Sequence, residues 1–131
     1  MSSKLLKPEK AFSGFSVKDI DEAETFYSKL LGLDVKKEDM GTLSLRLGDN
    51  EIFIYPKDNH EPATFTILNF PVDDIEQAVD QLKEKGITFE QYGGDIKTDK
   101  NGIFRHSASG PFMAWFKDPA GNILSVIQKE V

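Results

Sequence analysis

The sequence contains no cysteine, which excludes disulfide bonds, thiolate nucleophiles and cysteine-ligated metal sites. It also lacks any run of roughly 18 consecutive apolar residues, so no membrane-spanning helix and no membrane partner are expected. The first residues lack the apolar stretch of a signal peptide. These absences together favour a cytoplasmic location.

Basic side chains are too few and too scattered for a polyanion-binding surface. Lysine and arginine number 16 against 22 aspartates and glutamates, which gives a net charge of −6. Because nucleic-acid binding depends on clustered positive charge, no nucleic-acid partner is expected. No Ser-His-Asp order, phosphate-binding loop or dinucleotide fingerprint occurs either.

What the chain does contain is a repeat. Residues 15–23 (FSVKDIDEA) recur as residues 70–78 (FPVDDIEQA), with Phe, Val, Asp, Ile and Ala in register. Each copy resembles a strand that runs into a helix, and a repeat of this length indicates two supersecondary units. With 131 residues and 39% hydrophobic side chains, the chain is expected to fold as a single domain over residues 1–131.

The first module covers about residues 11–56. Asp19 is a good N-cap, with Glu22 at the capping-box position, and helical spacing of apolar residues continues to the stop signal at Gly32. Strands are expected at 11–17, 33–35, 43–47 and 51–55. A polar linker, residues 57–62, follows.

The second module covers about residues 63–129. Asp74 caps its helix and Gly86 ends it, and residues 118–122 (DPAGN) form a strong turn signal. Strands are expected at 64–72, 87–92, 103–106, 111–117 and 123–128.

Two motifs in these modules resemble the vicinal oxygen chelate superfamily, which includes glyoxalase I, bleomycin-resistance proteins and extradiol dioxygenases. They are residues 17–33 (VKDIDEAETFYSKLLGL) and 115–126 (WFKDPAGNILSV). The resemblance implies an α+β fold in which two β-α-β-β-β modules form a curved, cup-like mixed sheet with the helices outside. It also implies that function lies in the cup and that the protein forms a homodimer.

Metal-using members of that superfamily carry four ligands on the cup face, and the matching positions can be identified here. The first-strand ligand precedes the capping aspartate by seven residues, which gives Phe12 and Ile67. The last-strand ligand follows the glycine of the DPAGN turn by four residues, which gives Ser125, and its counterpart in the first module is Phe53. None supplies the imidazole or carboxylate that divalent metals of this class need. The resemblance therefore implies a member without a metal or other cofactor.

Alternation along the strands assigns side chains to the cup. If Phe15 and Val17 face the helix, then Phe12, Gly14 and Ser16 face the cup, and by the repeat Ile67 and Asn69 also face inward. The same alternation puts Phe53, Tyr55 and Ser125 inside, so the cup would be largely apolar with a few hydroxyl and amide groups. No catalytic residue is assigned. The candidate ligand-binding residues are Phe12, Ser16, Arg46, Phe53, Tyr55, Ile67, Asn69, His106, Trp115 and Ser125. A closed core filled by the same aromatic side chains is the alternative.

The remaining ionisable candidates have alternative interpretations. Arg46 and Arg105 could each pair an anionic ligand, or could form salt bridges to the many acids. His106 could border the pocket, whereas His60 in the linker is expected to be a surface residue. Trp115 could stack on a planar ligand or simply fill the sheet core.

The leading hypothesis is a protein that binds a small aromatic or amphipathic molecule in its cup without a metal, as bleomycin-resistance proteins do. One alternative is a glyoxalase-type lyase or isomerase, or a dioxygenase-related enzyme. Such an enzyme would take its metal ligands from positions other than the four identified above, or would transfer protons without a metal through His106 or Tyr55. Another is a structural or regulatory module that works through its helix faces.

Overall fold

The computed structural model describes residues 5–130 and confirms two modules of equal topology. The first contains β1 (Ser13–Val17), α1 (Ile20–Thr25) with a π-helical continuation (Phe26–Leu30), β2 (Asp34–Lys37), β3 (Leu43–Leu47) and β4 (Asn50–Pro56). The second contains β5 (Thr66–Pro71), α2 (Ile75–Glu84), β6 (Ile103–Arg105), β7 (Phe112–Lys117) and β8 (Ile123–Gln128). Short 3-10 turns lie at Pro8–Lys10 and Gly94–Ile96.

Each module forms its own four-stranded mixed sheet. The strand orders are β1-β4-β3-β2 and β5-β8-β7-β6, in which the first strand pairs parallel to the last and the other pairs are antiparallel. The predicted α+β class with two β-α-β-β-β modules is therefore confirmed. In the described part of the chain no ladder joins β1 to β5, so the cup consists of two sheets rather than one continuous sheet.

The prediction of a strand over residues 87–92 is wrong. Only Phe89 forms an isolated bridge, to Phe116. The backbone of Tyr92 pairs instead with Thr98, whose Oγ1 accepts from Tyr92 N at 2.9 Å while Thr98 N donates to Tyr92 O at 3.0 Å. These bonds turn the chain into a loop, because a backbone group committed to a loop partner cannot join a sheet ladder.

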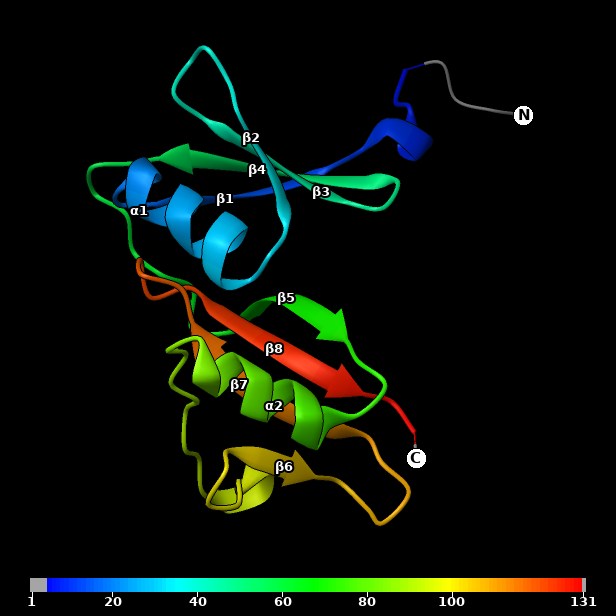
Figure 1. The fold of residues 1–131 in the computed structure, drawn as a ribbon. Coiled ribbons are helices and arrows are strands. Elements are labelled where there is room, and N and C mark those ends of the chain that lie inside the picture. The colour runs from blue at the N-terminus through cyan, green and yellow to red at the C-terminus, as the bar shows by residue number, and fades with distance from the viewer. Residues whose placement is uncertain (1–4, 131) are drawn as a thin grey trace.

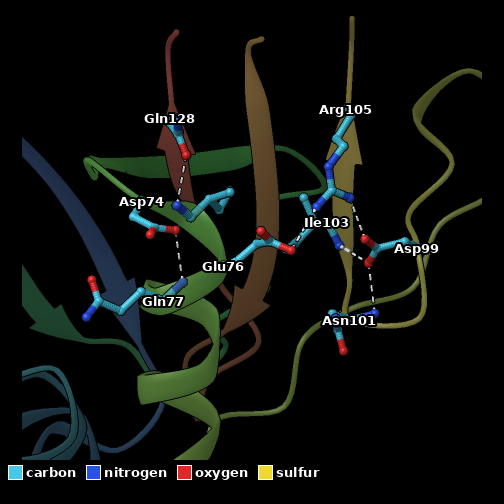
Figure 2. Close-up of polar contacts among 9 residues, drawn as sticks. Asp74, Glu76, Gln77, Asp99, Asn101, Ile103, Arg105 and Gln128 are labelled. Atoms are coloured by element: carbon cyan, nitrogen blue, oxygen red, sulfur yellow. Dashed lines mark hydrogen bonds and ion pairs between the residues drawn. The ribbon is translucent and has the colours of Figure 1, made fainter. Parts of the chain in front are cut away.

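Both predicted helix caps are confirmed. Asp19 Oδ1 accepts hydrogen bonds from the backbone N–H groups of Asp21 and Glu22 at 3.0 and 3.1 Å. Asp74 Oδ1 accepts from Gln77 N at 3.2 Å, as Figure 2 shows. Within residues 5–130, neither helix has the length and apolar character needed to cross a bilayer.

The sheets bury one face against the helices. Val17, Leu43 and Ile54 are at most 1% exposed on this face of the first sheet, and Leu124 and Phe116 are equally buried in the second. The ring of Phe15 lies 6.0 Å from that of Tyr27 on the first helix, which confirms that Phe15 faces the helix. One hydrophobic core runs through both modules.

The modules join through the first helix and the turn before β8. Figure 1 shows α1 between the first sheet and β8. The ring centroids of Phe26 and Phe116 lie 6.4 Å apart, and the Tyr27 hydroxyl donates to Asp118 Oδ2 at 2.7 Å. Asn122 Nδ2 donates to Ser16 O at 2.9 Å, which ties the end of β1 to the second module.

Candidate functional site

The inner face of the cup follows from strand register. In the first module Gly14 pairs with Phe53 and Ser16 with Tyr55, so these side chains share the face opposite the helices. In the second module Ser125 pairs with Asn69 on one side and with Trp115 on the other, so these three side chains share the corresponding face. This is the side assignment that alternation predicted.

Three aromatic rings line the inner face of the first module. Phe12 meets Phe53 edge to face at 6.4 Å between centroids, and Phe53 stacks on Tyr55 at 5.7 Å. The close approach of Gly14 makes room for this cluster, because a Cβ there would lie 3.0 Å from Phe53 O. The ring of Phe12 remains 65% exposed, so the cluster is not a sealed core.

Beside these rings lies a hollow of about 330 Å³, here called the first-module cavity. Its lining includes Phe12, Met40, Thr42, Ser44, Glu51 and Phe53. The Ser44 hydroxyl donates to Glu51 Oε1. Buried Thr42 Oγ1 has no hydrogen-bond partner among the described residues.

A second aromatic cluster lies on the inner face of the second module. Trp115 is 7% exposed, and its ring lies 5.3 Å from Tyr92 and 6.1 Å from Phe104. Burial first, and then the negative charge of Glu90, raise the pKa of Tyr92 above its usual value. The adjacent second-module cavity holds about 610 Å³, and its lining includes Phe65, Tyr92, Ile96, Trp115 and Lys117.

Two clefts follow the seam where the open edges of β1 and β5 face each other. The distal seam cleft holds about 570 Å³ and its lining includes Phe12, Glu51 and Asn69. The Ser125 hydroxyl, fully buried, donates to Asn69 Oδ1 at 2.5 Å. Ser125 therefore has no exposed surface of its own in the cleft, and Asn69 is the exposed member of the pair.

The other cleft, here called the seam cleft, holds about 410 Å³. Its lining includes Ser16, Tyr55, His60, Phe65, Ile67 and Asn122. Ile67 lies at a register shift between Thr66 and Leu68, which bends β5 at this point.

His60 is the residue that sequence reasoning missed. It was expected on the surface, but it is half-buried, with Nδ1 2.6 Å from Ser16 Oγ and Nε2 3.1 Å from Ala120 O. The linker connects β4 to β5, and β4 neighbours β1. Because the linker leaves β4 beside the end of β1, a histidine in the linker can contact residues of β1. The presence of His60 in this linker was therefore the sequence feature that could have indicated the contact.

The arginines separate into two cases. Arg105 forms ion pairs, with Nη1 2.5 Å from Asp99 and Nη2 3.4 Å from Glu76, as Figure 2 shows. Its guanidinium also lies over Phe112, so the salt-bridge interpretation of Arg105 is confirmed. Arg46 is exposed on the inner face, in register with Asp34 and Glu51, and lies outside the four hollows described above.

His106 does not line these hollows. Its exposed ring lies 6.4 Å from Phe104, at the end of β6. The structure therefore groups nine of the ten predicted residues on or beside the inner face and leaves His106 at its margin.

The residues at the superfamily's metal positions do not fit a metal. Phe53 and Ser125 occupy equivalent places, since each lies opposite the first strand of its module at Gly14 and Asn69. With Phe12 and Ile67 in the remaining positions, the four side chains offer one hydroxyl and no imidazole or carboxylate.

Exposed apolar side chains concentrate at the same hollows. Among residues 5–130, seven large hydrophobic side chains are exposed, and five of them line these hollows. The five are Phe12, Met40, Tyr55, Phe65 and Ile96. Apolar surface gathered in this way is typical of a binding site.

Comparison with known proteins agrees with this architecture. A family model described as the Glyoxalase/Bleomycin resistance protein/Dioxygenase superfamily matches residues 12–126. The crystal structure of SMU.1112c superposes with a TM-score of 0.67 at 24% identity, covering 93% of this chain and 100% of that one.

Two further solved structures share the fold. A glyoxalase family protein from Enterococcus faecalis has a TM-score of 0.63 at 24% identity, over 90% of this chain and 94% of its own. TnmS3, an antibiotic binding protein from Streptomyces sp. CB03234, has a TM-score of 0.62 at 22% identity, over 92% of this chain and 96% of its own.

Proposed function

Because this chain belongs to the Glyoxalase/Bleomycin resistance protein/Dioxygenase superfamily, we propose that it binds a small aromatic or amphipathic molecule in its cup, without a metal ion. The observation that carries this proposal is the gathering of exposed apolar side chains at the four hollows. Phe12, Met40 and Phe65 are 65%, 84% and 67% exposed there. Burying such surface against a ligand would contribute roughly 25 cal/mol per Å².

Polar groups among these rings would orient the ligand. Tyr55, Asn69 and Ser16 present hydroxyl and amide groups next to the apolar surface. A predominantly apolar hollow with a few polar groups is the usual composition of a small-molecule site. The hollows also have the size of such sites, at about 330 to 610 Å³ each.

The donor chemistry at the superfamily's metal positions supports binding rather than metal-assisted turnover. Two phenylalanines, an isoleucine and a serine stand where hard donors would be needed. TnmS3, an antibiotic binding protein, is an example of a protein of this fold that works as a binder. We propose the same mode here, in a cytoplasmic homodimer.

A thermal-shift screen of aromatic and amphipathic compounds tests the proposal. We expect hits that raise Tm, because a ligand that binds only the folded state adds RT ln(1 + [L]/Kd) to stability. Phe53→Ser should lower the affinity for these hits about tenfold, because it removes the ring that lies between Phe12 and Tyr55. Leu6→Ser, which removes an exposed apolar side chain outside the four hollows, is the matched control.

Two results would overturn the proposal. One is a screen without hits for the parent protein. The other is an equal change in the affinity for the hits in Phe53→Ser and in Leu6→Ser. Elemental analysis of untagged protein addresses the metal separately, since about one divalent ion per chain would support the enzyme alternative instead.

A further inference from the structure

In the seam cleft the hydroxyl of Ser16, one of the polar groups assigned above to ligand orientation, is hydrogen-bonded to His60. Ser16 Oγ lies 2.6 Å from His60 Nδ1, and His60 Nε2 lies 3.1 Å from the backbone oxygen of Ala120. Both side chains are half-buried and both line the cleft. The three groups come from β1, the linker and the turn before β8, so tertiary structure alone brings them together.

The partners of the imidazole determine its tautomer. A backbone carbonyl can only accept a hydrogen bond, so His60 Nε2 carries the hydrogen that is donated to Ala120 O. In the neutral ring Nδ1 then has a lone pair and no hydrogen. The hydrogen between Nδ1 and Ser16 Oγ must therefore come from the serine hydroxyl.

This arrangement makes the Ser16 hydroxyl a hydrogen-bond acceptor toward the cleft. Its single hydroxyl hydrogen is directed at His60, so only oxygen lone pairs remain for a ligand. Asn122 cannot serve as a donor in its place, because Nδ2 donates to Ser16 O at 2.9 Å and to Asp118 Oδ2 at 3.0 Å. The carboxylate of Glu61, also at the cleft, is another acceptor.

Apolar groups surround this acceptor. Phe65, Ile67 and the ring of Tyr55 line the same cleft, whose volume of about 410 Å³ suits a single-ring or two-ring compound. A ligand that fills the apolar part without a donor would keep the bond of Ser16 to His60 intact but leave the lone pairs of Ser16 Oγ without water or a hydrogen-bond donor. Leaving a polar group unpaired in this way lowers affinity.

We propose that the seam cleft selects ligands that carry a hydroxyl or N–H donor on an apolar ring, and that Ser16, held by His60, is the acceptor that reads this donor. The inference rests on the proposed binding function and assigns the ligand's chemistry. His60 acts as a positioning residue, since it orients the serine hydroxyl.

Paired ligands separate this inference from the binding proposal itself. 4-Ethylphenol and 4-ethylanisole share a ring and an ethyl group, but a methyl group replaces the hydroxyl hydrogen in the anisole. By NMR titration we expect the phenol to bind at least about fivefold more tightly. Ser16→Ala should abolish this preference and leave anisole affinity within about twofold. Ser107→Ala, in an exposed loop, should retain it.

The imidazole provides a readout that needs no variant of the site. The chain has two histidines, so His106→Gln assigns their ring nitrogens. We expect His60 in the Nε2–H form, with an Nδ1 resonance that shifts on addition of the phenol and stays unchanged with the anisole. An Nδ1–H form would overturn the inference.

The remaining outcomes are equally distinct. Equal binding of the two ligands by the parent would overturn the inference, leave the binding proposal intact and indicate that the Ser16–His60 pair only fastens the linker. Binding of neither ligand, together with a screen without hits, would overturn both proposals.

Discussion

The hydroxyl of Tyr27 donates a 2.7 Å hydrogen bond to Oδ2 of Asp118, 91 residues further along the chain. Asp118 Oδ1 also accepts from the backbone N–H groups of Ala120 and Asn122, at 2.9 Å each. One buried carboxylate therefore shapes the turn before β8 and holds the first helix to it. Through Asn122 the same network reaches Ser16 and the seam cleft.

Removing the Tyr27 hydroxyl should destabilise the protein. Tyr27→Phe leaves part of buried Asp118 without its donor, and we expect the free energy of unfolding to fall by about 1 to 3 kcal/mol. Urea unfolding measures the change. Tyr55→Phe, at a side chain that is 37% exposed, should change stability much less. Equal effects of the two substitutions would contradict a special role for the Tyr27 contact.

Alkaline pH should act through the same residue. Burial first, and then the charge and hydrogen bond of Asp118, raise the pKa of Tyr27 well above its usual value of 10.0. The folded state therefore retains a proton that the unfolded state releases, so this stability contribution is present below about pH 10 and is lost above it. Tyr27→Phe should flatten the alkaline decline of urea-derived stability, and an unchanged decline would be evidence against this linkage.

The loop before β6 should weaken in acid. Burial alone would raise the pKa of Asp99, but hydrogen bonds from Ile103 N, Arg105 and Asn101 N outweigh it and lower the pKa below 3.8 (Figure 2). The folded state thus binds fewer protons, so this contribution is present above about pH 4 and is lost as pH falls below it. In Asp99→Asn the hydrogen-exchange protection factors of the amides of residues 101 and 103 should fall at neutral pH, and acid should lower these protection factors less than in the parent. Unaltered exchange would refute this prediction.

Glycine is required in the DPAGN turn for two reasons. Gly121 has a φ of +86°, and a Cβ there would lie 3.1 Å from Cγ of Pro62 in the linker. Gly121→Ala should therefore lower the free energy of unfolding by about 1 kcal/mol or more. Gly93, whose φ is −114°, would place a Cβ in open space, so Gly93→Ala should be nearly neutral. Thermal unfolding of both variants compares them, and similar Tm values would contradict the prediction.

Ligand binding should change the fluorescence of Trp115. This residue is the single tryptophan of the chain and lines the second-module cavity beside Tyr92. Because it is 7% exposed, we expect blue-shifted emission in the folded state, and quenching when an aromatic ligand stacks nearby. Fluorescence titration with the thermal-shift hits measures this, and Leu6→Ser should titrate like the parent. Hits that leave the emission unchanged would place the ligand in one of the other hollows.

Local chemistry made much of the fold predictable. The caps at Asp19 and Asp74 depend on bonds to residues at most three positions away, and the inner-face assignment of Phe53 and Ser125 depends on alternation within a strand. The repeat then indicated how the modules correspond. The predicted strand at 87–92 failed because Tyr92 pairs with Thr98 in a loop, a choice that β-forming residues alone do not reveal.

By itself, the sequence determined two β-α-β-β-β modules, the aspartate caps and the lack of metal donors at Phe12, Phe53, Ile67 and Ser125, because residue type and short-range spacing control these features. Only the tertiary structure decided that His60 meets Ser16, that Arg105 pairs with Asp99 and Glu76, and that the exposed apolar side chains share the same hollows. Most of these contacts join segments far apart in the chain. They depend on how the two sheets and the linker pack, which short-range sequence patterns do not determine.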